Sequence, residues 1–397
     1  MNMSPEQLLA LRTTYRDGLL QDTLPFWSKH AVDTEFGGFT FALDRDGTII
    51  DTDKGIWQHG RFTWLLGTLY NRVERRTEWL DLCRHGIDFL RKHAFDSDGR
   101  MFFLVTRDGR PLRKRRYVYS EAFGAMAFAA YAKASGDGAA AKEARRLFDL
   151  FVKFSTEDGH IPPKVDPETR PLQSIGPYMI MINMAQTLRD ALDDDSFTTT
   201  IDQAIETIAN TFMKPDLEVV METVGADGEI VDHFDGRLLN PGHSIEAAWF
   251  IMEEGRLRQD KSLISVGTQI LDWMWARGWD EEYGGLKYFV DVYGKPVQEY
   301  WHDMKFWWNH NEAIIATLLA YELTGQEKYA LWHRQIHDWS YAHFPDTEYG
   351  EWFGYLHRDG RISSTLKGNI WKGPFHLPRM QLTCMDIVER LSAARGD

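Results

Sequence analysis

Four ten-residue segments share one pattern: GFTFALDRDG (38–47), RMFFLVTRDG (100–109), GLKYFVDVYG (285–294) and EWFGYLHRDG (351–360). In each, apolar residues alternate along a short run that ends at a turn glycine, which predicts a strand entering a β-hairpin. Successive copies lie about 60 residues apart, or about three times that distance between the second and the third. Two more copies are therefore expected between them. VVMETVGADG (219–228) fits this pattern well, and the loop GHIPPKVDPETR (159–170) fits it poorly.

Between these segments, apolar residues recur with the helical period, which predicts two helices for each unit. The expected helices span 55–72 and 76–93, 118–135 and 137–155, 177–192 and 197–213, 243–258 and 261–277, 303–323 and 327–344, and 374–394. A further helix at 4–30 opens with SPEQ, a capping box with proline at its first position. The last helix has no successor, so we expect it to pair with the first and close a ring.

Six helical hairpins closed in this way form an (α/α)6 barrel, an all-α fold of twelve helices with short β-hairpins at one mouth. An open α-solenoid is the alternative, but solenoids need polar faces on their end repeats, and the terminal helices here are apolar. No linker, charge run or low-complexity stretch divides the chain. We therefore expect a single domain over residues 1–397.

Composition limits the partners and the location. The net charge of −14 disfavours a duplex nucleic acid or an anionic membrane surface as a partner. The N-terminus lacks a signal-peptide core, and the longest apolar stretch (313–321) is too short for a membrane span. Two cysteines, Cys83 and Cys384, exclude a disulfide framework and favour a cytoplasmic location. The 15 tryptophans suit an aromatic core and give a weaker indication of a sugar-binding cleft.

In such a ring the inner helices start beside the hairpins, so their first turns would line a cleft at that mouth. These starts carry polar groups: Arg61, Tyr119, Asn183, His243 with Glu246, His310 with Glu312, and His376. A lone histidine near a helix start is more often a cap or a satisfied core group, but three on separate inner helices favour a site. Glu246 could orient the His243 imidazole from one turn away, or could simply be a helix-surface contact.

Other chemistries find less support. His243, His310 and His376 could together hold a metal, but no common metal-ligand spacing is present, and we expect no metal and no cofactor. Phosphate-loop, dinucleotide and nucleophile-elbow motifs are absent from the sequence. We expect His59, beside Arg61, to be structural.

Longer motifs surround these residues: DKGIWQHGR (53–61), NPGHSIEA (240–247), KFWWNHNEA (305–313), EYGEWFGYL (348–356) and KGPFHLPR (372–379). Together they resemble the N-acylglucosamine 2-epimerase family over nearly the whole chain. That family holds N-acylglucosamine, cellobiose and mannose 2-epimerases and aldose–ketose isomerases on an (α/α)6 barrel.

The resemblance implies site residues. It places His243 and His376 on the two catalytic histidines, and Arg61, Glu246, Tyr119 and Asn183 on other site positions. The further expected substrate contacts are Trp57, Trp308, His310, Glu312 and Trp371. At the position before His310, several relatives have a hydrophobic residue or proline, whereas this chain has Asn309. A histidine at position 310 favours the N-acylglucosamine type over the disaccharide type. Some members of the family require a nucleotide as an activator. This sequence has no recognisable nucleotide-binding loop, so the resemblance does not extend to that property.

The implied reaction inverts the carbon next to an aldehyde. It needs a base on one face, an acid on the other and a stabilised ene-diolate, so two histidines suit it and Arg61 suits the developing oxyanion. One histidine must also help to open the sugar ring. No metal, nicotinamide or phosphate is required.

Alternatives stay open at this stage. Within the family they are a mannose–fructose isomerase and a cellobiose 2-epimerase. Outside it, a glycoside hydrolase would use Asp303 with Glu246 or Glu312, and a non-catalytic carbohydrate-binding protein would use the aromatic cleft alone. In each case the expected partner is a small sugar, with no nucleic acid and no membrane; a homodimer is allowed.

Overall fold

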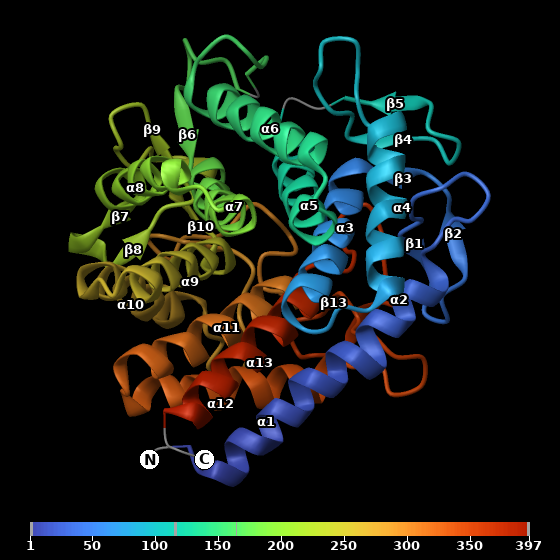
Figure 1. Cartoon of the computed structure of the whole chain (residues 1–397). Coiled ribbons are helices and arrows are strands. Elements are labelled where there is room, and N and C mark those ends of the chain that lie inside the picture. Colours follow the sequence, from blue (N-terminus) through green and yellow to red (C-terminus); the bar gives the residue numbers. More distant parts are fainter. Residues whose placement is uncertain (1–2, 115–116, 164, 395–397) are drawn as a thin grey trace.

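The computed structural model describes residues 3–114, 117–163 and 165–394, and its helices form an inner and an outer ring (Figure 1). The inner helices are α3 (Ile56–Arg72), α5 (Tyr119–Ser135), α7 (Gly176–Leu192), α9 (Pro241–Arg258), α11 (Trp307–Thr324) and α13 (His376–Ala393). The outer helices are α1 (Pro5–Asp17) with α2 (Leu24–His30), α4 (Thr77–His93), α6 (Gly138–Thr156), α8 (Thr198–Thr207), α10 (Lys261–Gly278) and α12 (Glu327–His343). Six inner and six outer positions alternate along the described chain, so the predicted (α/α)6 barrel is confirmed.

Hydrophobic patterning separates the two rings. Helices α5 and α11 are apolar on nearly every face and are buried along most of their length, as an inner helix with neighbours on both sides requires. Helices α4 and α6 keep an apolar stripe toward the inner ring and charged residues toward solvent.

Local signals set most helix ends as the sequence predicts. Ser4 caps α1 in a full capping box, and Asp137 and Asp260 cap α6 and α10. Most bounds agree within two residues, but three of the expected helices differ by more. The helix expected at 4–30 contains a π-helical turn (Gly18–Thr23), the one at 197–213 ends in another (Ile208–Phe212), and residues 305–306 are a strand.

The ring closes between the two ends of the chain, as predicted. Helix α1 packs against α13 (Figure 1). The first hairpin also pairs with the segment before α13, because Leu43 N–H donates to the Gly368 carbonyl (3.2 Å) and Lys367 N–H donates to the Leu43 carbonyl (3.0 Å).

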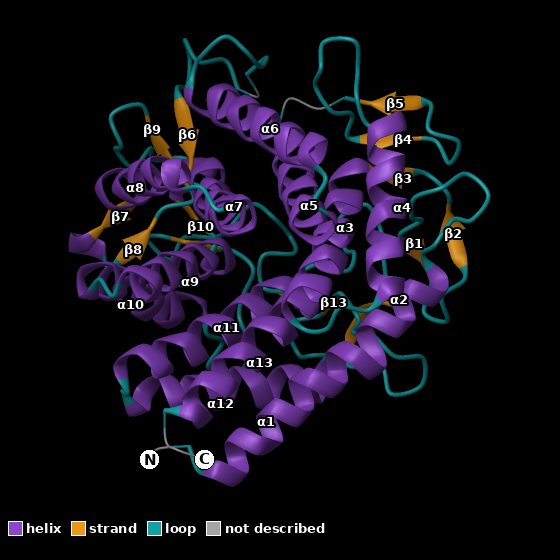
Figure 2. Ribbon diagram, viewed as in Figure 1, coloured by secondary structure: helices purple, strands orange, loops and turns teal. Residues whose placement is uncertain are grey.

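The strands are short antiparallel pieces between the helices (Figure 2). Two sheets have three strands: β3 (Lys54–Gly55), β4 (Leu104–Val105) and β5 (Pro111–Arg113); and β12 (Lys305–Phe306), β13 (Tyr355–Leu356) and β14 (Ile362–Ser364). Four are pairs: β1 (Ala42–Leu43) with β2 (Ile49–Asp51), β6 (Leu172–Ser174) with β9 (Thr223–Gly225), β7 (Met213–Lys214) with β8 (Val219–Val220), and β10 (Leu238–Leu239) with β11 (Val290–Asp291).

Three of the predicted hairpins form as expected, at 38–47, 100–109 and 351–360. Their turns close at Gly47, Gly109 and Gly360, whose φ values of 87°, 89° and 85° favour glycine. At 219–228 and 285–294 the turns form, but the local hairpin prediction is wrong: β8, β9 and β11 pair with strands outside these segments. The chain after each turn runs on as a loop, so β9 pairs with β6 and β11 pairs with β10, which both precede the intervening helices, while β8 pairs with β7 directly before it. The described residues of 159–170 form turns and no strand; Lys164 lies outside the described residues.

Buried ion pairs repeat around the ring. In three units an aspartate that follows an outer helix accepts hydrogen bonds or ion pairs from a buried lysine and from the arginine of a hairpin turn. These sets are Asp33 with Lys54 and Arg107, Asp280 with Lys305 and Arg358, and Asp346 with Lys367 and Arg45. Because Arg45 belongs to the first hairpin, the last set links the two ends of the chain.

Within the described part of the chain, none of the helices combines the length and apolar character needed to cross a membrane. Cys83 and Cys384 are both buried and unpaired.

Candidate active site

A cavity of about 700 Å³ opens at the mouth where the inner helices start. Its aromatic lining residues are Trp57, Tyr119, Phe123, Tyr288, Trp301, Phe306, Trp307, Trp308, Tyr355, Trp371 and Phe375. Its polar lining residues are Arg61, His243, Glu246, Asn369 and His376. A cavity of this size with a few convergent polar groups is typical of a small-molecule site.

The start of α9 presents His243 to this cavity. Asn240 caps the helix by accepting from the backbone N–H of His243 (3.2 Å). The ring Nδ1 lies 2.9 Å from Oε1 of Glu222, which comes from the link between β8 and β9. Burial opposes a charged ring, yet the Glu222 carboxylate, with Glu246 and Glu312, raises the pKa of His243 above its ordinary value.

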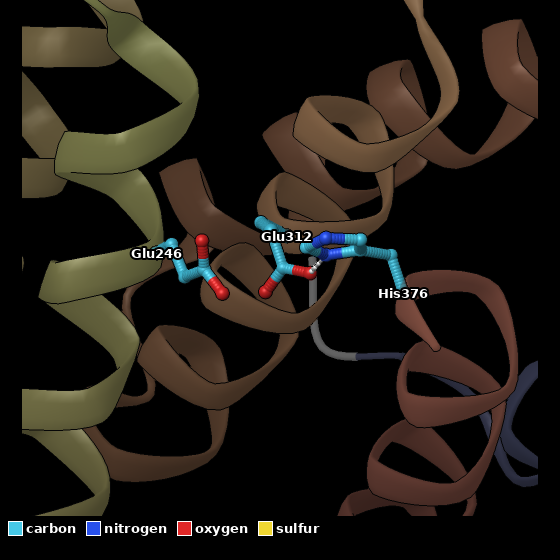
Figure 3. A group of neighbouring side chains, drawn as sticks. All are labelled: Glu246, Glu312 and His376. Carbon is cyan, nitrogen blue, oxygen red and sulfur yellow. Dashed lines mark hydrogen bonds and ion pairs between the residues drawn. The ribbon is translucent and has the colours of Figure 1, made fainter. Parts of the chain in front are cut away.

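The start of α13 presents His376 in a different electrostatic setting. Its Nδ1 lies 2.7 Å from Oε1 of Glu312 on α11. Arg379, one turn further along α13, donates to Glu246 and lies 2.7 Å from Glu312. Burial first, and then the nearby guanidinium of Arg379, lower the pKa of His376 well below its ordinary value. Figure 3 shows Glu246, Glu312 and His376 converging from three inner helices.

Trp308 packs against both imidazoles. Its ring centroid lies 5.0 Å from that of His243 and 5.7 Å from that of His376. The two histidines therefore border the cavity from different helices and share a contact with one aromatic ring.

Arg61 lies in an aromatic box. Its guanidinium carbon sits 4.3 Å from the ring centroid of Trp57, 4.1 Å from that of Phe123 and 4.5 Å from that of Phe375. Burial and the like charge of Arg379 lower the pKa of Arg61 to about 9, so it stays charged at neutral pH. No group in the described part of the chain accepts a hydrogen bond from its buried Nε. Arg61 thus brings a positive charge to the wall of the cavity.

The structure brings most of the predicted site residues together at this cavity: Trp57, Arg61, Tyr119, His243, Glu246, Trp308, Trp371 and His376. Glu312 is fully buried beneath the cavity and reaches it through His376, while also accepting from the indole N–H of Trp249 (2.7 Å).

Two expected placements are wrong. His310 does not line the cavity: its Nδ1 bonds the Phe306 carbonyl (2.6 Å), its Nε2 accepts from Leu286 N–H (3.0 Å), and it stacks on Trp339 of the outer ring. Asn183 lies in the second turn of α7, beyond the helix start, and lines a separate cavity of about 350 Å³.

Of the two interpretations of Glu246 that the sequence left open, the structure supports neither a contact that orients His243 nor a mere surface contact, because Glu246 is buried. Glu246 pairs with Arg379, and it is Glu222 that contacts the His243 ring. Sequence reasoning missed both Glu222 and Arg379. Glu222 lies inside the repeated segment 219–228, and Arg379 ends the motif KGPFHLPR. The sequence therefore indicated that both residues lie near the site, but not which side chains they contact.

A metal site finds little room here. The proposed trio fails because His310 is elsewhere. Ligand atoms of Glu246, Glu312 and His376 do lie within 4.8 Å of one another, but the Arg379 guanidinium already contacts both carboxylates. The carboxylate pair of a hydrolase is likewise not assembled, since neither Asp303 nor Glu312 lines the cavity.

Comparison with known proteins identifies similar chains. Residues 37–376 match the family described as N-acylglucosamine 2-epimerase (GlcNAc 2-epimerase). The N-acylglucosamine 2-epimerase of Bos taurus is 35% identical over 382 residues, which cover 94% of this chain and 90% of that protein. A cellobiose 2-epimerase of Dictyoglomus turgidum is 24% identical, covering 97% of this chain and 100% of that protein. The structure of a cellobiose 2-epimerase from Bacillus thermoamylovorans B4167 superposes with a TM-score of 0.83 at 22% identity, covering 96% of this chain and 100% of that one.

Proposed function

The chain belongs to the N-acylglucosamine 2-epimerase family, and from this premise we propose that it is a carbohydrate 2-epimerase, an isomerase that interconverts gluco- and manno-configured aldoses. The observation that carries the proposal is the pair His243 and His376, which border one aromatic cavity from two helices, each with a glutamate on its Nδ1.

The two histidines have opposite electrostatic environments, which suits opposite roles. A raised pKa favours the charged form of His243, which can donate a proton, whereas a lowered pKa favours the neutral form of His376, which can accept one. In one direction His376 takes the C2 proton, the C–H electron pair forms the C1–C2 double bond, and O1 becomes negative. His243 then delivers a proton to the opposite face of C2, which inverts it. The reverse reaction exchanges the two roles.

Other residues stabilise the intermediate and the substrate. Arg61 offers a fixed positive charge to the ene-diolate oxygen, where charge develops. Trp57, Trp308 and Trp371 offer flat apolar faces to the C–H surfaces of a sugar. Before this chemistry one histidine must assist ring opening, because only the open aldehyde acidifies C2.

We propose an N-acylated glucosamine or mannosamine as the substrate. The support is the identity of 35% to an N-acylglucosamine 2-epimerase against 24% to a cellobiose 2-epimerase. His310 does not support this choice of substrate, because the structure places it outside the cavity. Glucose and mannose are the second candidates.

Incubation in deuterium oxide with N-acetylglucosamine, N-acetylmannosamine, glucose, mannose and cellobiose tests this proposal. We expect NMR to show the 2-epimer of an N-acetyl sugar with deuterium at C2 and little ketose. Fructose as the main product from mannose would identify an aldose–ketose isomerase, and cleavage of a glycosidic bond would identify a glycoside hydrolase. Either result would overturn the proposal.

Two sequence-based predictions stay predictions alongside it: a single domain over residues 1–397 and a cytoplasmic location. A homodimer is allowed by the sequence but is not predicted. We propose in addition that the reaction uses no metal or other cofactor, since proton transfer by side chains suffices.

A further inference from the structure

Two glutamates contact the Nδ1 atoms of the two cavity histidines, and their surroundings differ. Glu312 is paired with Arg379 and also accepts from Trp249, so a guanidinium offsets much of its charge. Glu222 contacts His243 through both oxygens, at 2.9 and 3.1 Å. In the described ranges of the chain, no lysine or arginine forms an ion pair with Glu222.

The backbone holds Glu222 in place. Its N–H donates to the Leu238 carbonyl (3.2 Å), and its carbonyl accepts from Ile175 N–H (3.2 Å), next to the start of α7. The carboxylate is thus fixed between two units of the barrel. A rigid acceptor of this kind can select both the orientation and the tautomer of a histidine ring.

We propose that Glu222 is a positioning residue: it holds the His243 ring with Nδ1–H toward its carboxylate and Nε2 toward the sugar, and keeps that ring charged before turnover. The proposal rests on the epimerase function and deepens it, because it assigns which histidine starts as the acid and what makes it so. Glu222 itself does not line the cavity.

The other groups around His243 are consistent with this assignment. Glu246 on the same helix and Glu312 on α11 add negative charge, but both are shared with Arg379. His376 on α13 is the facing imidazole. Burial first, and then the Glu222 carboxylate, raise the pKa of Tyr119 and of Tyr288, so both hydroxyls stay neutral donors.

The substitution Glu222→Gln removes the charge at nearly constant shape. Its amide N–H can donate to Nδ1 and so move the ring proton to the wrong nitrogen. Glu222→Asp keeps the charge on a shorter arm. Glu229→Gln is the matched control, because it removes one negative charge from an exposed side chain seven residues further along the chain.

The first readout is the titration of the ring by ¹⁵N NMR of histidine-labelled protein, with the His243 signal assigned from a His243→Asn sample. We expect a doubly protonated ring at pH 7 in the wild type, the Glu229→Gln control and Glu222→Asp. In Glu222→Gln the ring should lose its proton about one pH unit lower or more. A neutral ring at pH 7 in the wild type, or the same titration in Glu222→Gln, would overturn the proposal.

The second readout is the pH profile of C2 epimerisation. The alkaline limb reports loss of the His243 proton, so Glu222→Gln should move it about one pH unit toward acid and lower kcat at pH 7 about tenfold or more, with KM little changed. Unchanged profiles in that variant would contradict the inference. If no sugar is epimerised but the NMR titration still shifts, the proposed function fails while the pairing of Glu222 with His243 stands.

Discussion

At the scale of single residues, the site contains two histidines whose different neighbours give them different pKa shifts. His243 and His376 each contact a glutamate through Nδ1, so their hydrogen bonding alone does not distinguish them. Burial lowers the pKa of both rings, but the Glu222 carboxylate more than offsets this at His243, whereas Arg379, 3.3 Å from His376 Nδ1 and paired with Glu312, adds to it at His376. Opposite pKa shifts on two similar groups are what an acid and a base on opposite faces of one carbon require.

The two-base scheme makes a prediction specific to each face. In His243→Asn, His376 can still remove and return the C2 proton on its own face. In His376→Asn, His243 can do the same on the opposite face. Both variants should lose epimerisation by about 100-fold or more, the effect typical of a lost general acid or base. Each should still exchange C2 hydrogen with deuterium oxide, one variant in the gluco epimer and the other in the manno epimer, as measured by NMR. Exchange of both epimers in one variant would contradict the scheme, and unchanged circular dichroism is the control for folding.

At the scale of elements, the repeated unit explains why some histidines are structural. His59 and His310 occupy the same place on α3 and α11. Each bonds the carbonyl four residues earlier and accepts a backbone N–H from a repeated segment, of Phe39 and Leu286 respectively. Each ring also stacks on an aromatic ring of the outer helix. A histidine of this kind ties an inner helix to its hairpin segment.

We therefore expect His310→Ala to lower the free energy of unfolding by about 3 kcal/mol, from lost buried hydrogen bonds and packing, and to leave kcat per folded molecule nearly unchanged. Burial first, and then Lys305, lower the pKa of His310 from 6.5 to about 3. Its stabilising contribution is thus complete above pH 6.5 and is lost as the pH falls toward 3, because the unfolded chain binds the proton first. The variant should show a shallower loss of stability with acid over that window, in urea unfolding at several pH values.

His59→Ala is the matched variant and should behave in the same way, since burial also lowers the pKa of His59 to about 3. A large fall in kcat with normal stability in His310→Ala would return His310 to the active site.

At the scale of the whole molecule, closure of the ring holds the cavity in shape. The residues that line it come from all six inner helices, so opening the barrel anywhere would separate them. The last repeated ion-pair set, Asp346 with Lys367 and Arg45, lies at the junction of the two ends of the chain. Asp346 and Lys367 are almost completely buried there, and Arg45 is half-exposed.

Asp346→Asn would leave a buried lysine without its counter-charge, so we expect it to lower the free energy of unfolding by about 3 kcal/mol in urea denaturation. Asp33→Asn, at the corresponding place inside the chain, should cost a similar amount. Arg45→Ala should cost clearly less, because its side chain is partly solvated. An Asp346→Asn protein as stable as the wild type would show that helix packing alone closes the ring.

The sequence by itself determined the barrel, the order of its helices and four of the five polar residues that line the cavity. Helical period, capping residues and turn glycines are local features, and they act on the same stretch of chain that displays them. Tertiary structure alone decided which histidines are available for chemistry. His243 and His310 both begin inner helices, yet only the fold sets Glu222 against one and Leu286 N–H against the other. It also decided the charge of each ring, because a pKa depends on groups that approach through space from distant parts of the chain.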